Sequence, residues 1–184
     1  MRNISVVDSR YRERSVTVAW LKTPSGAVAA LMVVTFLARL LFAASLGLGI
    51  DESYMVAAGR KLQLSYFDHP PVAWWLAWGA AHLTGSESAI VVRLPFIALF
   101  ALTTFLIYRV TSALLNAEAG LWAAVVLNVA PVLGITAGTW VLPDGPLFAA
   151  LLGTTAAEVR QEMEWLAEAA GGDDPPTIEV TPGR

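Results

Sequence analysis

The stretch "GAVAALMVVTFLARLLFAASLGLGI" at residues 26–50 decides the fold class, because it is an apolar run that only Arg39 interrupts. As an α-helix it would be about 37 Å long, enough to cross a hydrocarbon core of about 30 Å. An arginine near the bilayer centre costs about 2.5–3.5 kcal/mol on insertion, so we expect Arg39 to face the bundle interior and to pair with a polar group elsewhere. The run is interpreted as an uncleaved first transmembrane span, since it is too long for a signal peptide.

The composition also indicates a membrane protein. Of the 184 residues, 56% are hydrophobic and 15% are charged, whereas soluble domains contain about 25% charged residues. The absence of cysteine excludes disulfides and thiolate metal sites. The net charge is -3 and no basic stripe is visible, so we expect no nucleic-acid partner.

The order of apolar segments predicts the topology. The leader at residues 1–25 contains five basic and two acidic residues, which favours a cytoplasmic N-terminus. Further apolar segments lie at 88–108, 119–142 and 145–157, the last too short to span alone. We therefore expect a multi-pass protein of the inner (cytoplasmic) membrane, with the loops after residues 50 and 142 on its outer side.

Two short helices are expected in the first outer loop. Residues 51–63, "DESYMVAAGRKLQ", predict a surface helix with Asp51 as its N-cap and Glu52 near the positive end of its dipole. Residues 71–85 contain Trp74, Trp75 and Trp78, which favour the membrane boundary and are interpreted as an anchor. The predicted fold is all-α, a polytopic membrane helix bundle with two interfacial amphipathic helices.

The end of the chain differs in character. The transmembrane region covers residues 26–157. Residues 158–184 then predict an acidic amphipathic helix, "EVRQEMEWLAEAA", and a disordered tail.

Five ionisable residues gather on the predicted outer side, and each has two readings. Asp51 and Glu52 either take part in acid–base chemistry or cap a helix. Asp144, in "LPDGP", is either a site residue or a helix cap. Asp68 and His69 precede two prolines, so they either form a rigid turn or face a phosphate or a metal ion.

Taken together, "GIDESY" at 49–54, "LSYFDHPP" at 64–71, the Trp-rich helix and "LPDGPL" at 142–147 resemble the N-terminal part of GT-C membrane glycosyltransferases. The resemblance covers about residues 26–152. It is closest to the family 39 group, which includes protein O-mannosyltransferases and aminoarabinose transferases. It implies an active site at the outer membrane face and a polyprenyl-phosphate sugar donor, transferred with inversion.

The resemblance also implies roles for the five residues. Asp51 maps onto the proposed catalytic base, whereas Glu52, Asp68, His69 and Asp144 are expected to bind substrate. The departing phosphate needs a nearby cation, either a histidine or a divalent metal ion. Whether a metal is bound stays open; its candidate ligands are Glu52, Asp68 and His69.

The chain leaves the family pattern near residue 153, whereas family members continue with many more helices. We expect a truncated homologue, a fragment or one part of a split transferase. The alternative is a non-catalytic membrane module that uses its acidic end to bind a larger membrane subunit.

Overall fold

The computed structural model describes residues 20–171, in which all regular structure is helical and the predicted all-α class is confirmed. Most of the predicted leader and the tail after residue 171 lie outside this range. The labelled helices are α2 (Pro24–Ser45), α3 (Ile50–Gly59), α4 (Val72–Thr84), α5 (Ala89–Leu114), α6 (Ala117–Val129), α7 (Pro131–Thr136) and α8 (Asp144–Gly171).

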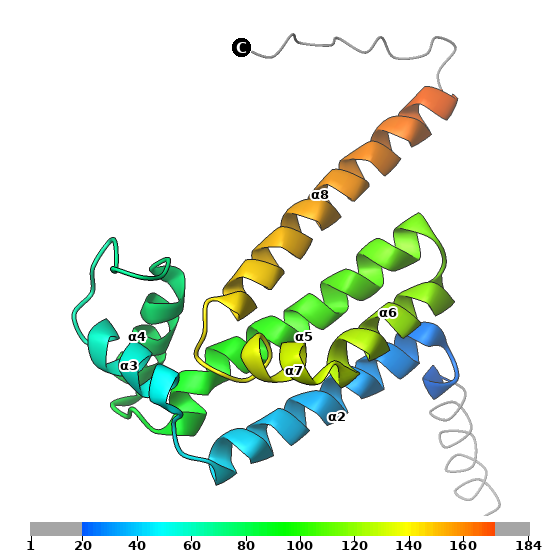
Figure 1. Cartoon of the computed structure of the whole chain (residues 1–184). Coiled ribbons are helices and arrows are strands. Elements are labelled where there is room, and N and C mark those ends of the chain that lie inside the picture. The colour runs from blue at the N-terminus through cyan, green and yellow to red at the C-terminus, as the bar shows by residue number, and fades with distance from the viewer. Residues whose placement is uncertain (1–19, 172–184) are drawn as a thin grey trace, which may run out of the picture.

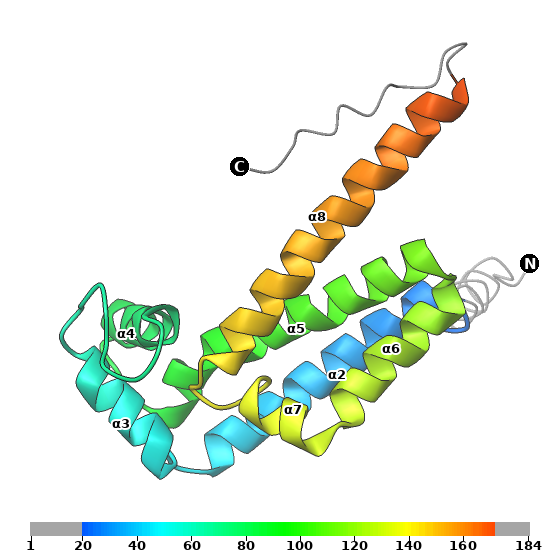
Figure 2. The ribbon, with the colours of Figure 1, turned by 45° about the horizontal axis from the view of Figure 1, so that its top comes forward.

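Helices α2, α5 and α6 lie side by side and form the long part of the bundle (Figure 1, Figure 2). Both α2 and α5 are long and apolar enough to cross a membrane, each with a mean hydropathy of 2.3. Only 11% of the apolar window of α2 is buried, which is typical of a helix that faces lipid. The helix starts at Pro24, and the Thr23 hydroxyl caps it by accepting a hydrogen bond from the Gly26 N–H at 3.2 Å.

The two short helices predicted between the first spans are present as α3 and α4, packed on each other at one end of the bundle (Figure 1). The N-cap of α3 is Gly49, so the expectation that Asp51 caps this helix is wrong. Asp51 lies in the first turn, and Glu52 reaches back to accept from the Gly49 N–H at 2.8 Å. Helix α4 ends at Thr84, and Gly85, which follows, has a φ of 68° in the left-handed region that glycine adopts without strain.

Trp74 is a core residue, which corrects its assignment to a membrane anchor. Its side chain is 0% exposed. The ring stacks on Tyr66 at 4.1 Å between centroids and meets Tyr54 edge-on at 5.6 Å. Trp75 points about 100° away around the helix and is 39% exposed, so an anchoring role stays a prediction for Trp75 and Trp78.

The segment at 119–142 is not one helix. Helix α6 ends at Val129, and the short α7 begins at Pro131. Proline has no N–H to donate and disfavours helical geometry in the residue before it, and Ala130 is indeed extended. The chain then runs without regular helix to Asp144, so α6 and α7 together replace the third predicted span.

Helix α8 joins two segments that the sequence suggested were separate. It is continuous through 144–171, 28 residues or about 42 Å, and includes both the apolar part and the charged part. It packs against α5 near its start and leans away from the bundle toward its C-terminal end (Figure 1, Figure 2).

Arg39 has the polar partner that its place in α2 requires, as predicted. Its Nη1 donates to Asn128 Oδ1 at 3.2 Å, and its guanidinium lies over the Phe100 ring at 4.4 Å. Asn128 in turn donates to Thr104 Oγ1 at 3.0 Å. The network links α2, α5 and α6 within the apolar part of the bundle.

Candidate functional site

A buried ion pair lies beneath the candidate site and supports it. Glu52 and Arg93 are each 1% exposed. Arg93 Nε donates to Glu52 Oε1 at 2.8 Å, and Nη2 donates to Oε2 at 2.6 Å, so the contact is bidentate. The backbone N–H groups of Gly49 and Val141 donate to the same carboxylate at 2.8 and 3.2 Å.

Arg93 also caps the C-terminal end of α2. Its Nη1 donates to the carbonyl of Leu46 at 2.9 Å, and its Nη2 donates to that of Gly47 at 2.8 Å. These carbonyls lie at the C-terminal end of α2, where a helix leaves its last acceptors unsatisfied and favours a cation. We refer to Glu52, Arg93 and their backbone partners as the Glu52–Arg93 lock. It fixes the end of α2, the start of α3, α5 and the loop before α8 relative to one another.

Burial and hydrogen bonding act on Glu52 in opposite directions. Burial raises the pKa of the Glu52 carboxyl, but the hydrogen bonds from Arg93, Gly49 and Val141, together with the charge of Arg93, outweigh it. The pKa therefore lies below its ordinary value and the group is ionised. Both oxygens already accept two hydrogen bonds each, so the carboxylate has little capacity left for a ligand.

Asp51 lies next to this lock but faces outward. Its side chain is exposed, and within residues 20–171 it has no hydrogen-bond partner. Tyr54, three residues later, is on the same side of α3. Its hydroxyl lies 3.5 Å from Asp68 Oδ1, a marginal hydrogen bond that brings the loop after α3 over this side of the helix.

Asp68 and His69 form a second exposed group. Asp68 Oδ2 lies 3.3 Å from His69 Nδ1, which orients the imidazole ring. Both side chains remain open to solvent, and Pro70 and Pro71 fix the turn that leads into α4. Asp68 and His69 can therefore belong to a rigid turn and at the same time present their side chains to a ligand.

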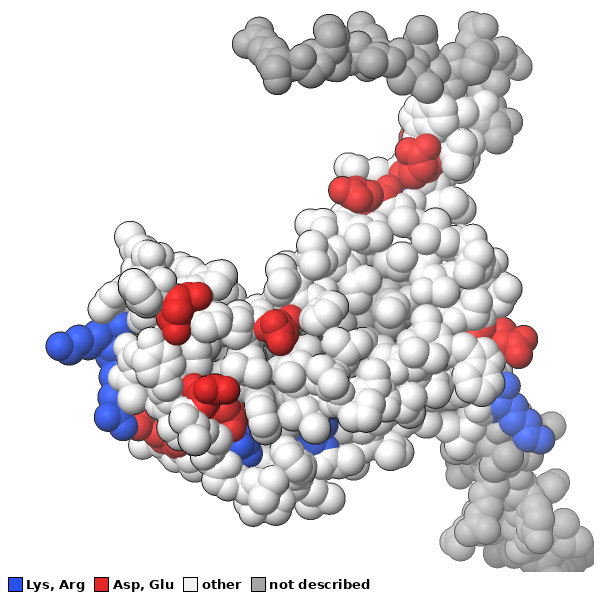
Figure 3. All heavy atoms as spheres, viewed as in Figure 1, with Lys and Arg blue, Asp and Glu red and all other residues white. Residues whose placement is uncertain are grey.

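Asp144 begins α8 and is half-buried. The close approach of this helix start to the end of α7 requires Gly145, because a Cβ there would lie 2.7 Å from the Ala137 carbonyl oxygen. Val141, three residues before Asp144, is held by Glu52. The structure thus brings Asp51, Asp68, His69 and Asp144 to the same end of the bundle. Figure 3 shows separate acidic groups over α3 and the following loop and at the start of α8.

The metal prediction gains no support from the geometry. Among the described residues, no three His, Cys, Asp or Glu side chains come together as ligands. Glu52 in particular is bound within the lock, apart from the exposed Asp68–His69 pair. The three candidate ligands do not form a common site, so we derive no step through a metal ion.

Among residues 20–171, all regular structure is helical and two helices are long and apolar enough to cross a membrane, as in helical membrane proteins. Residues 68–167 match the dolichyl-phosphate-mannose-protein mannosyltransferase family, and the chain belongs to this family. No curated protein and no solved structure matches the chain. The family supports the predicted GT-C-like resemblance, a membrane location and a glycosyltransferase type of function.

Sequence reasoning missed two residues of the site. Arg93 was not predicted as a site residue, although an arginine within the apolar segment 88–108 implies a polar or anionic partner. Tyr54 was not considered, and its spacing of three residues from Asp51 was the available signal.

Proposed function

We propose that the chain transfers a sugar from a polyprenyl-phosphate donor to an acceptor hydroxyl at the outer face of the cytoplasmic membrane. The family match supports the class of reaction. The single observation that carries the proposal is an exposed carboxylate, Asp51, placed beside a buried Glu52–Arg93 lock that fixes its position.

The residues divide into reacting and positioning groups. Asp51 is the base that accepts the proton of the acceptor hydroxyl as the sugar is transferred. His69, oriented by Asp68, stabilises charge on the departing lipid phosphate, and Asp144 binds polar groups of the substrate. Glu52 acts as a positioning residue, because its carboxylate is already engaged by Arg93 and two backbone N–H groups.

The proposed topology follows from charge and helix order. A basic N-terminal leader favours the cytoplasmic side, so α2 crosses outward and α3, α4 and the start of α8 lie on the outer surface. The lipid phosphate of a polyprenyl donor lies at this same boundary, within reach of exposed polar groups.

The test is Asp51→Asn in membranes supplied with polyprenyl-phosphate-linked radiolabelled mannose and a mixed acceptor extract. We expect transfer by the wild-type chain, loss of that transfer in the variant, and unchanged membrane insertion. The matched control is Glu118→Gln, which removes an exposed carboxylate from the first turn of α6 at the other end of the bundle.

Two results would overturn the proposal. Wild-type turnover in Asp51→Asn would remove the base from the mechanism. A wild-type chain that transfers no sugar but co-purifies with a larger membrane subunit would instead support the non-catalytic module.

A further inference from the structure

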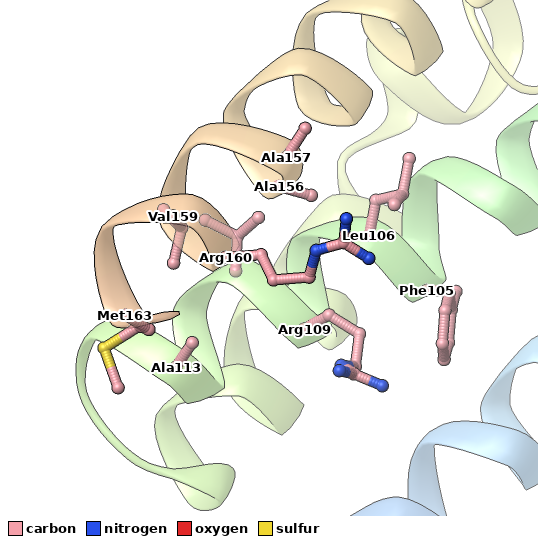
Figure 4. Close-up of a pocket in the computed structure, with 10 residues that line it drawn as sticks. Phe105, Leu106, Arg109, Ala113, Ala156, Ala157, Val159, Arg160 and Met163 are labelled. Atoms are coloured by element: carbon pink, nitrogen blue, oxygen red, sulfur yellow. The ribbon is translucent and has the colours of Figure 1, made fainter. Parts of the chain in front are cut away.

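A groove opens between α5 and α8 at the end of the bundle opposite the candidate site. Its volume is about 530 Å³. It forms where α8 leans away from α5, and Figure 4 shows side chains from both helices lining it. Its lining is mostly apolar and includes Phe105, Leu106, Val110 and Met163.

Two arginines are the charged residues of this lining, one from each helix. Arg109 comes from α5 and Arg160 from α8, and none of the lining residues is acidic. Figure 4 shows the Arg160 side chain extending from α8 toward α5, whereas the Arg109 side chain leaves α5 and points away from α8. Two like charges along one groove favour a bound anion.

The neighbouring acidic residues do not neutralise this pair. Arg160 Nε lies 3.5 Å from Glu164 Oε1, but the two side chains are 77% and 64% exposed, so the contact is a weak surface pair. Glu158 and Glu162 lie about 200° from Arg160 around the helix and face away from it. Arg109 contacts the Phe105 ring at 5.8 Å.

The depth of the two arginines matches a membrane boundary. Along α5, Arg109 lies about 24 Å from Arg93, which marks the candidate-site end. Along α8, Arg160 lies about 24 Å from Asp144. Since a hydrocarbon core is about 30 Å thick, both guanidinium groups reach the level where phospholipid phosphates of the other leaflet lie.

We propose that the α5–α8 groove binds an anionic phospholipid of the leaflet opposite the candidate site. Arg109 and Arg160 hold its phosphate, and an acyl chain lies along the apolar lining. Basic pockets between membrane helices recognise such head groups, and the ligand fills the gap that α8 leaves as it diverges from α5. This binding does not depend on sugar transfer.

The test uses the full chain in detergent with equal amounts of dioleoyl phosphatidylglycerol and dioleoyl phosphatidylcholine, and native mass spectrometry measures the retained lipid. We expect the wild type to prefer phosphatidylglycerol. Arg109→Gln and Arg160→Gln should each lower the preference about fivefold, and the double variant about 25-fold.

Two further variants distinguish lipid binding at the α5–α8 groove from a general attraction of anionic lipid to positive charge. Arg60→Gln with Lys61→Gln removes two cations near α3 and should leave the preference unchanged. Arg109→Lys with Arg160→Lys keeps both charges and should retain most of it. Equal retention of the two lipids by the wild type would overturn the proposal. The proposal would also be overturned if the Arg60/Lys61 variant lost as much of the preference for phosphatidylglycerol as the double glutamine variant. The same holds if the double glutamine variant kept the lipid preference but no longer formed a dimer that the wild type forms.

Discussion

Replacing Arg93 with methionine tests the Glu52–Arg93 lock most severely. The variant keeps a long side chain but leaves the Glu52 carboxylate 1% exposed and without its cation. It also removes the donors that satisfy the carbonyls of Leu46 and Gly47. Removing one partner of a buried pair costs about 3–5 kcal/mol of unfolding free energy. The folded-to-unfolded ratio should therefore fall by about two to three and a half orders of magnitude.

The assay is SDS titration in mixed micelles, followed by tryptophan fluorescence. The chain provides a matched control in Arg60→Met. Arg60 Nη2 lies 2.6 Å from Glu87 Oε2, the same distance as in the buried pair, but the two side chains are 64% and 40% exposed. Because water and salt screen such a pair, the control should change stability little.

The pH dependence adds a second readout. Since the folded pKa of Glu52 is below its ordinary value of 4.5, the stability from this carboxylate is present above about pH 4.5 and is lost as pH falls through the folded pKa. In Arg93→Met, the hydrogen bonds and the charge of Arg93 no longer oppose the effect of burial. The pKa of Glu52 therefore rises, and the carboxyl becomes neutral at a higher pH than in the wild type. The stability gap between wild type and variant should narrow as pH falls. If Arg93→Met were as stable as Arg60→Met at neutral pH, or if the difference in unfolding free energy did not change with pH, Arg93 would not stabilise the fold by holding the Glu52 carboxylate.

Two further predictions use the same titration. Trp74→Ala should lower the unfolding free energy by about 3–5 kcal/mol, because the ring is 0% exposed between two tyrosines, whereas Trp75→Ala should lower it much less; equal losses would contradict the core assignment. Asn128→Leu should cost about 1–3 kcal/mol by removing the acceptor for Arg39, while Val129→Leu, at a 66% exposed position, should be nearly neutral. An unchanged stability in Asn128→Leu would show that Arg39 does not depend on this partner.

The sequence was sufficient for features that depend on local composition. Apolar length identified α2 and α5 as helices long enough to cross a membrane, and the prolines at 70 and 71 marked the break between α3 and α4. The need of Arg39 for a polar partner also followed from its place in an apolar run. These predictions held because each rests on neighbouring residues alone.

Features that depend on packing could not be predicted in the same way. Glu52 and Arg93 are 41 residues apart, so no local pattern links them. Trp74 and Trp75 are adjacent but point in different directions, and only the packed structure shows which one is buried. Hydropathy predicted one span at 119–142 because it depends on side-chain polarity alone. Pro131 interrupts the helix because it lacks a backbone N–H to donate.

The proposed mechanism requires Asp51 and Asp144 to lie on one outer surface, and labelling of single cysteines measures whether they do. The chain contains no native cysteine, so Asp51→Cys, Asp144→Cys and Arg109→Cys can each be probed separately. In right-side-out membrane vesicles, an impermeant maleimide should label positions 51 and 144 from outside and should reach position 109 only after the vesicles are opened. Labelling of positions 51 and 144 from opposite sides, or of either one only after opening, would show that the two residues do not share an outer site.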